Sequence, residues 1–78
     1  MDIDEAKRIR VLEIAAAIFE CDATVLSESS SVSTADGWDS MNHLKLMLAL
    51  EKEFQLVFDE EVLVELLSFE LIFEELQI

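Results

Sequence analysis

The sequence predicts an all-α domain built as a four-helix bundle, with one long loop between the first and second helices. The chain has no proline and one glycine, so few turn or strand signals interrupt it. Apolar residues recur at helical spacing in several segments. Since 53% of the 78 residues are hydrophobic, the chain is too apolar for a disordered acidic tail, and residues 1–78 are expected to fold as one domain.

The first predicted helix covers residues 4–20. Its apolar residues recur every three or four positions, at Val11, Ile14, Ala15 and Ile18. Asp2 or Asp4 is expected to cap it, because an aspartate oxygen can accept a hydrogen bond from a free N–H of the first turn.

A polar segment, residues 21–38, follows with five serines and two threonines. It is predicted to be a long loop whose anchors in the core are Val25, Leu26 and Val32. Two interpretations stay open: long loops in small domains are often functional, but this one could also be a tolerated connector.

The second helix is predicted from Ser40 to Phe54, with Asp36 or Asp39 as its N-cap. The acids at 59–61 start a short third helix, where they favour the positive end of the helix dipole. Ser68 is expected to cap a last helix over residues 69–77.

The second helix carries two apolar stripes. The first comprises Leu46, Met47, Leu50 and Phe54, and it is expected to face the core. The second comprises Met41, Leu44 and Leu48. It is either buried as well or available for docking partners, and its start beside Ser40 favours docking.

The charge restricts the classes of partner. With 18 acidic residues against 5 basic ones, the formal charge is -13, so binding to nucleic acid or to an anionic membrane surface is not expected. Basic patches on partner proteins would speed encounter. No signal peptide or membrane-spanning segment is seen, and Cys21 is the only cysteine, so we expect a cytoplasmic monomer without disulfide or metal.

Ser40, at the start of the second predicted helix, could have a catalytic, attachment or capping role. His43 lies on the same helix face, but the chain has no G-x-S-x-G elbow and no second glycine to shape an oxyanion hole. We therefore predict a solvated His43, no catalysis, and no calcium loop at Asp36 and Asp39, whose spacing does not fit one. The remaining roles are attachment of a phosphate ester, favoured by the helix N-terminus, or simple capping.

The segment GWDSM, 37–41, resembles the G-x-D-S-L motif of acyl carrier proteins. The resemblance continues in HLKLMLALEKEF, 43–54, and in DEEV, 59–62, and it extends to length, charge and helix order. It implies the acyl-carrier fold, with 4′-phosphopantetheine from coenzyme A attached to Ser40, and a chain that carries an acyl group as a thioester and is not an enzyme. Asp39 and Gly37 belong to the same attachment motif.

The resemblance also implies a set of partner enzymes in fatty-acid, polyketide or related biosynthesis. These are a phosphopantetheinyl transferase, an acyl-loading synthetase or transferase, and enzymes of the ketosynthase or acyltransferase kind. The residues expected to meet them are Met41, Leu44, Lys45 and Leu48.

The chain departs from the family pattern at several positions. Met41 replaces the usual leucine, and Asn42 and Lys45 stand where the family is often acidic. Phe58 replaces the common proline before the third helix. A tryptophan before the aspartate, Trp38, is a feature more similar to discrete, specialised carriers than to the general fatty-acid carrier. Lys45 predicts poor binding to general fatty-acid synthase enzymes.

Two alternatives remain beside the acyl carrier. One is a peptidyl or aminoacyl carrier, which would use Ser40 in the same way. The other is a cofactor-free acidic helical interaction module, which has no need of a serine at this helix start.

Overall fold

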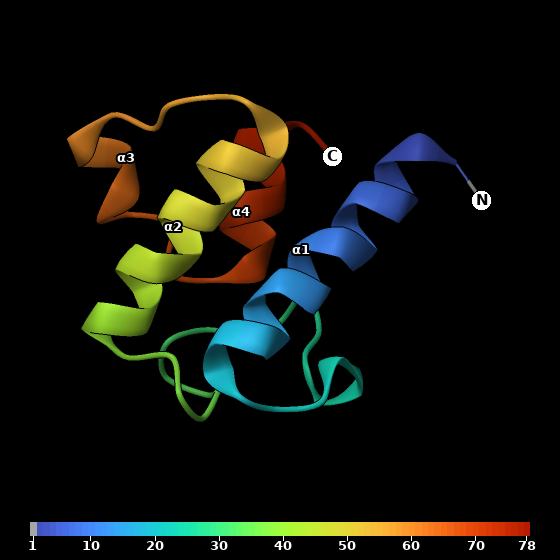
Figure 1. Cartoon of the computed structure of the whole chain (residues 1–78), viewed down its shortest axis with the longest axis vertical. Coiled ribbons are helices and arrows are strands. Elements are labelled where there is room, and N and C mark those ends of the chain that lie inside the picture. Colours follow the sequence, from blue (N-terminus) through green and yellow to red (C-terminus); the bar gives the residue numbers. More distant parts are fainter. Residues whose placement is uncertain (1) are drawn as a thin grey trace.

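The computed structural model describes residues 2–78, in which helices are joined by loops (Figure 1). The elements in chain order are α1 (Ile3–Phe19), the 3₁₀ turn η1 (Ala23–Val25), α2 (Ser40–Phe54), α3 (Glu60–Leu63) and α4 (Phe69–Leu76). The described residues contain no strand beyond a single bridge between Ser31 and Ser68. The all-α prediction is confirmed, and the predicted helix ends lie within one residue of the observed ones.

Side-chain caps set the starts of α1, α2 and α4. Asp2, Asp39 and Ser68 each accept a hydrogen bond from the backbone N–H three residues later, at 2.7, 2.8 and 3.2 Å. Of the paired candidates, Asp2 rather than Asp4 and Asp39 rather than Asp36 are therefore the caps. Each cap satisfies one N–H that has no acceptor inside its helix.

Three helices end at a residue other than glycine in the left-handed conformation. Glu20, Gln55 and Gln77 follow α1, α2 and α4 in the left-handed region, with φ of 57°, 54° and 59°. Glycine usually occupies this position, because a Cβ atom makes the conformation costly. The chain's one glycine, Gly37, lies instead in the turn before α2.

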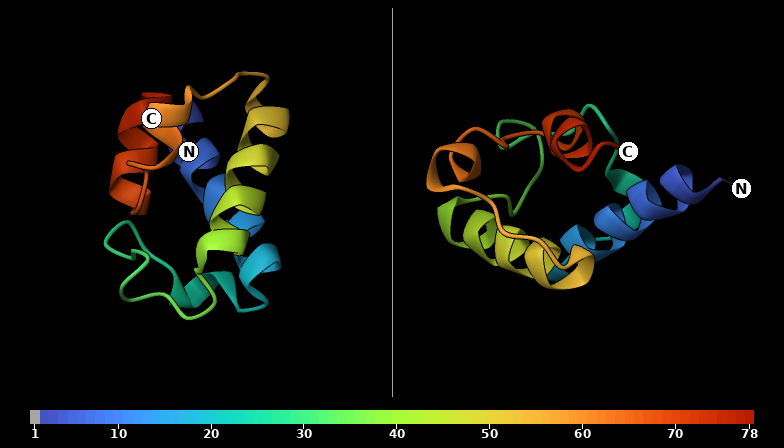
Figure 2. Two further views of the ribbon diagram at one scale, coloured as in Figure 1. Left: turned by 90° about the vertical axis from the view of Figure 1, so that its left-hand side faces the viewer. Right: turned by 90° about the horizontal axis from the view of Figure 1, so that it is seen from above.

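The core lies between the packed pair α1 and α2 and the helix α4, which covers it from the opposite side (Figure 2). Its fully buried large side chains come from these three helices: Val11, Leu46, Met47, Leu50, Phe69 and Ile72. The short α3 lies at the edge and contributes no buried residue. Within the described chain, every helix is too short or too polar to cross a membrane.

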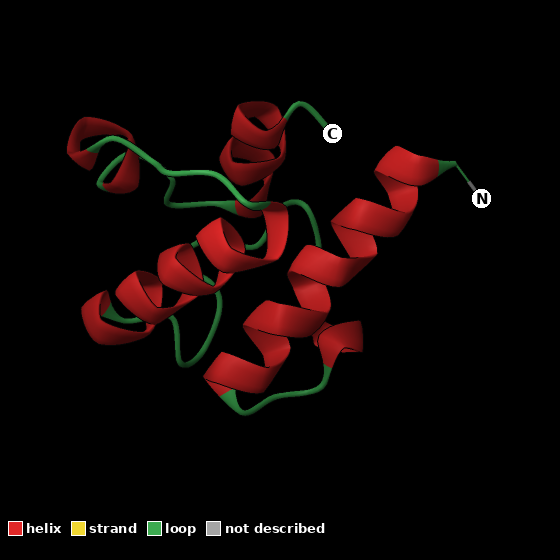
Figure 3. Cartoon of the chain, turned by 45° about the horizontal axis from the view of Figure 1, so that its top comes forward, coloured by secondary structure: helices red, strands yellow, loops and turns green. Residues whose placement is uncertain are grey.

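The loop between α1 and α2 passes around the end of the molecule at which α2 begins (Figure 3). Leu26 anchors it in the core as predicted, but the prediction for Val25 and Val32 is wrong, since they are 68% and 36% exposed. The main anchor is Trp38, whose ring centroid lies 5.3 Å from that of Phe19 and 4.7 Å from that of Phe69. An indole buries more apolar area than either valine, so it takes the central place.

The same loop completes the first turn of α4. The carbonyl oxygens of Ser30 and Glu28 accept hydrogen bonds from the backbone N–H groups of Phe69 and Glu70, each at 3.1 Å. With Ser68 as cap, the first three N–H groups of α4 all have acceptors. The long loop is therefore bound to α4 along its backbone.

Candidate functional site

Ser40 is the first residue of α2, and its side chain is exposed. Asp39 supplies the cap oxygen, so the alternative in which Ser40 merely caps the helix is wrong. Among residues 2–78 no hydrogen bond engages the Ser40 hydroxyl, and the N–H groups of Ser40 and Met41 have no acceptor within the helix. The hydroxyl stands free beside two backbone donors at the positive end of the α2 dipole.

Gly37 shapes the turn that leads into Ser40. Its φ is 86°, and a Cβ atom at this position would lie only 3.0 Å from the backbone oxygen of Phe19. Only glycine combines this conformation with so close an approach to the end of α1. Asn42 holds the turn from the other side, since its Nδ2 donates a 2.7 Å hydrogen bond to the Gly37 oxygen. Asn42 therefore has a structural role, besides being uncharged at a position where an acidic residue was expected from the resemblance.

His43 is not the solvated residue that the sequence predicted. It is half-buried, its Nδ1 accepts a 3.0 Å hydrogen bond from Trp38 Nε1, and its Nε2 lies 2.8 Å from the Leu63 oxygen. Because an indole N–H can only donate, Nδ1 must be the acceptor, and Nε2 carries the proton that Leu63 accepts. His43 thus joins the loop, α2 and α3 through its two ring nitrogens.

Phe58, which stands where the family commonly has proline, also has a structural role. Its side chain is buried, and its backbone N–H donates a 2.7 Å hydrogen bond to Glu51 Oε2. Proline has no N–H and could not make this bond. A proline at position 58 would therefore lose the bond that ties the segment after α2 back to Glu51.

The two stripes of α2 separate as expected. Met41, Leu44 and Leu48 are 68%, 53% and 56% exposed, whereas Leu46 and Leu50 are fully buried. Met47 is buried too, but Phe54 is only half-buried, which corrects its assignment to the core. The Phe54 side chain packs against the core but stays partly exposed.

Two apolar pockets flank Ser40. The first, of about 520 Å³, is lined by Val32, Trp38, Asp39, Ser40, His43, Val64 and Leu67. The second, of about 350 Å³, is lined by Ser40, His43, Leu44, Met47, Glu60, Leu63 and Val64. Ser40, His43 and Val64 belong to both pockets, so Ser40 lies at the boundary between two mostly apolar pockets.

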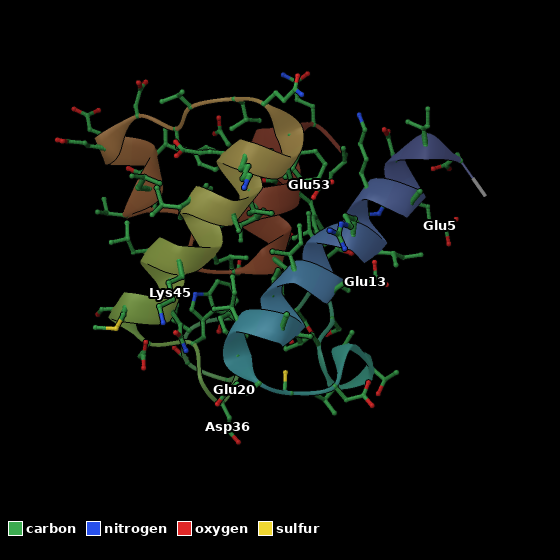
Figure 4. All side chains as sticks on the ribbon, viewed as in Figure 1. Glu5, Glu13, Glu20, Asp36, Lys45 and Glu53 are labelled. Carbon is green, nitrogen blue, oxygen red and sulfur yellow. The ribbon has the colours of Figure 1, made fainter. Side chains whose placement is uncertain are left out.

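The ionic contacts lie apart from this group of residues. Arg10 of α1 approaches Glu13 at 3.9 Å and Glu53 of α2 at 3.3 Å (Figure 4). The pKa of Asp22 is lowered by hydrogen bonds from the backbone N–H and the hydroxyl of Thr24. The Arg10–Glu53 contact joins two helices, and Asp22 caps η1.

Trp38, His43 and Asn42 are the members of the site whose contacts the sequence did not indicate. A buried indole usually finds an acceptor, so a tryptophan five residues before a histidine was the one available signal. The Leu63 carbonyl offers no such signal, because any residue has one.

The comparisons with known proteins add no relative to this picture. No protein-family model matches the chain, and no match was found among curated proteins. The residues around Ser40 and their geometry are therefore the basis for assigning a function.

Proposed function

We propose that the chain is a cytoplasmic acyl carrier protein with the four-helix fold of that family. It would carry an acyl group on a 4′-phosphopantetheine arm attached to Ser40. The observation that supports this most directly is the Ser40 hydroxyl, which is exposed and unengaged at the start of α2 because Asp39 has taken over the capping role.

The residues present fit a phosphodiester at this position. The N–H groups of Ser40 and Met41 are open to an anion, and the helix dipole favours negative charge there. Ser68 makes a useful contrast, because its hydroxyl is occupied by the cap of α4 and the neighbouring N–H groups are covered by the loop. When attached, the group supplies the thiol on which cargo travels.

The surroundings of Ser40 favour a carrier over an enzyme. Both ring nitrogens of His43 are engaged, with Trp38 and with the Leu63 oxygen, so neither is free to take a proton from the serine. The two pockets beside Ser40 are mostly apolar and suit the alkyl part of an acyl group. A carrier must hold its cargo without hydrolysing it, and the His43 imidazole is not free to act as a base for hydrolysis.

The proposed partners are a phosphopantetheinyl transferase, an acyl-loading synthetase or transferase, and ketosynthase-type or acyltransferase enzymes. A peptidyl or aminoacyl carrier is the second candidate, and the apolar lining of the pockets favours acyl cargo over it. A cofactor-free interaction module is the third candidate. It leaves the unengaged Ser40 hydroxyl unexplained.

The test is incubation of the purified chain with coenzyme A, Mg²⁺ and a phosphopantetheinyl transferase of broad specificity, followed by intact mass measurement. We expect the mass of one phosphopantetheine group to be added. Ser40→Ala should remain folded, since Asp39 still caps α2, and should gain nothing. Ser33→Ala, at an exposed loop serine, is the matched control and should be modified normally. Modification of the Ser40→Ala variant would overturn the assignment.

A further inference from the structure

One side of α2 has a charge opposite to that of the whole chain. It comprises Met41, Leu44, Lys45, Leu48 and Lys52, which we name the α2 ridge. All five side chains are exposed, and none is acidic. In a chain with a formal charge of -13, this is a local cationic and apolar surface, and Lys45 extends from it in Figure 4.

The two acids of α2 contact groups other than the ridge lysines. Glu51 is bound to the backbone N–H of Phe58 at 2.7 Å, and Glu53 faces Arg10 at 3.3 Å. In the described part of the chain, neither Lys45 nor Lys52 forms an ion pair. The two ammonium groups are therefore available to a partner.

The spacing along the ridge defines what would fit it. Lys45 and Lys52 are seven residues apart, so they lie on the same side of the helix, about 10 Å apart along its axis. Leu48 lies between them, and Met41 and Leu44 continue the apolar surface toward Ser40. On the α3 side the ridge is bordered by Glu60, which lines the pocket next to Leu44.

We propose that the α2 ridge is the docking surface for an enzyme whose contacting face presents carboxylates around an apolar patch. The carboxylates would meet Lys45 and Lys52, and the patch would cover Met41, Leu44 and Leu48. This inference rests on the proposed function, because the enzyme it describes is one that works at Ser40. It reverses, for this surface, the expectation from net charge that partners are basic.

The probes for a test are two amphipathic helical peptides of about five turns that share one leucine face. One has glutamates on its polar face, and the other has lysines. Each is titrated into the ¹⁵N-labelled chain of residues 1–78 at physiological ionic strength. We expect the glutamate peptide to shift the amide resonances of Met41 to Lys52, with binding that weakens as salt is added.

Charge variants separate local docking from the overall field. Lys45→Glu with Lys52→Glu should weaken the glutamate peptide about tenfold, since two exposed ion pairs are lost and two repulsions are gained. Lys7→Glu with Arg8→Glu, on α1, changes the net charge by the same amount and should leave the affinity within about twofold, because salt screens distant charges. Equal weakening by both pairs of changes would overturn the proposal.

Other occupants of the ridge are outcomes of the same experiment. Binding of the lysine peptide on the ridge would mean that this surface is recognised by basic partners, and it would overturn the proposal. Concentration-dependent shifts of the ridge resonances without any peptide would identify a second copy of the chain as the occupant, and they would also overturn the proposal.

If Ser40 accepts phosphopantetheine but the glutamate peptide leaves the ridge unshifted, this inference fails and the carrier proposal stands. If the glutamate peptide shifts the ridge while Ser40 stays unmodified, the ridge is supported and the carrier proposal fails.

Discussion

The indole Nε1 of Trp38 donates a hydrogen bond to Nδ1 of His43 over 3.0 Å, and the two rings lie nearly parallel with centroids 6.1 Å apart. This contact ties the loop before Ser40 to the helix that Ser40 starts. It also fixes the tautomer of His43, whose other nitrogen holds α3 through the Leu63 oxygen.

His43→Ala should destabilise the fold by about 1–3 kcal/mol, because it leaves the buried indole N–H without an acceptor. Urea denaturation measures this change. Leu44→Ala is the neighbouring control, and its cost should be small since the side chain is half-exposed. In the native chain, ¹H–¹⁵N correlation of the imidazole should show the proton on Nε2, and a proton on Nδ1 would contradict the bonding described.

Gly37→Ala should cost about 1–3 kcal/mol, because alanine is strained at positive φ and its Cβ would meet the Phe19 oxygen. Ala35→Gly, in the same loop, serves as a comparison for the general effect of changing loop entropy. The melting temperatures of the two variants measure the difference. A Gly37→Ala variant as stable as the native chain would show that the turn can relax away from α1.

Leu50→Ala should cost about 2–5 kcal/mol, a large part of the stability of so small a domain, because Leu50 is fully buried. Leu44→Ala should leave stability nearly unchanged but slow the modification of Ser40 by a transferase. Denaturation and modification rate are measured on both variants. Equal losses of stability would place Leu44 in the core.

Gln55→Gly should stabilise the chain by about 0.5–1 kcal/mol, because glycine adopts the left-handed conformation at the end of α2 without a Cβ penalty. Gln55→Ala keeps the Cβ and should give no gain. Thermal unfolding of both variants tests the argument, which fails if alanine stabilises as much as glycine.

Asp22 should show the pH dependence of a carboxyl group whose pKa is lowered in the folded state by the Thr24 N–H and hydroxyl. Its contribution to stability is present above the unfolded pKa and is lost as the pH falls through the folded pKa. Thr24→Val removes only the hydroxyl and should raise the pKa of Asp22 part of the way back, as measured by ¹³C NMR titration. An unchanged Asp22 titration in that variant would assign the shift to the backbone N–H alone.

Helix boundaries were predictable because their signals are local. Asp2, Asp39 and Ser68 mark helix starts through bonds that reach only three residues. The position of Ser40 at the start of α2 was predictable for the same reason, since it directly follows the cap residue Asp39.

The contacts of the site were less predictable because they join distant segments. The position of His43 depends on a backbone oxygen 20 residues away, and periodicity along α2 does not reveal that acceptor. The choice of Trp38 over Val25 and Val32 as loop anchor was decided by the space between Phe19 and Phe69, which lie 50 residues apart in the sequence and meet only after folding.

The binding of the long loop to the first turn of α4 has a consequence for the order of folding. Phe69 and Glu70 cannot protect their amide hydrogens from exchange until Ser30 and Glu28 have come into place from about 40 residues earlier in the chain. Helices α1 and α2 can pair without that step, whereas α4 gains a complete N-terminus only once the loop has closed. The amides of Phe69 and Glu70 are therefore expected to lose protection whenever the loop opens, and such an opening would loosen the start of α4.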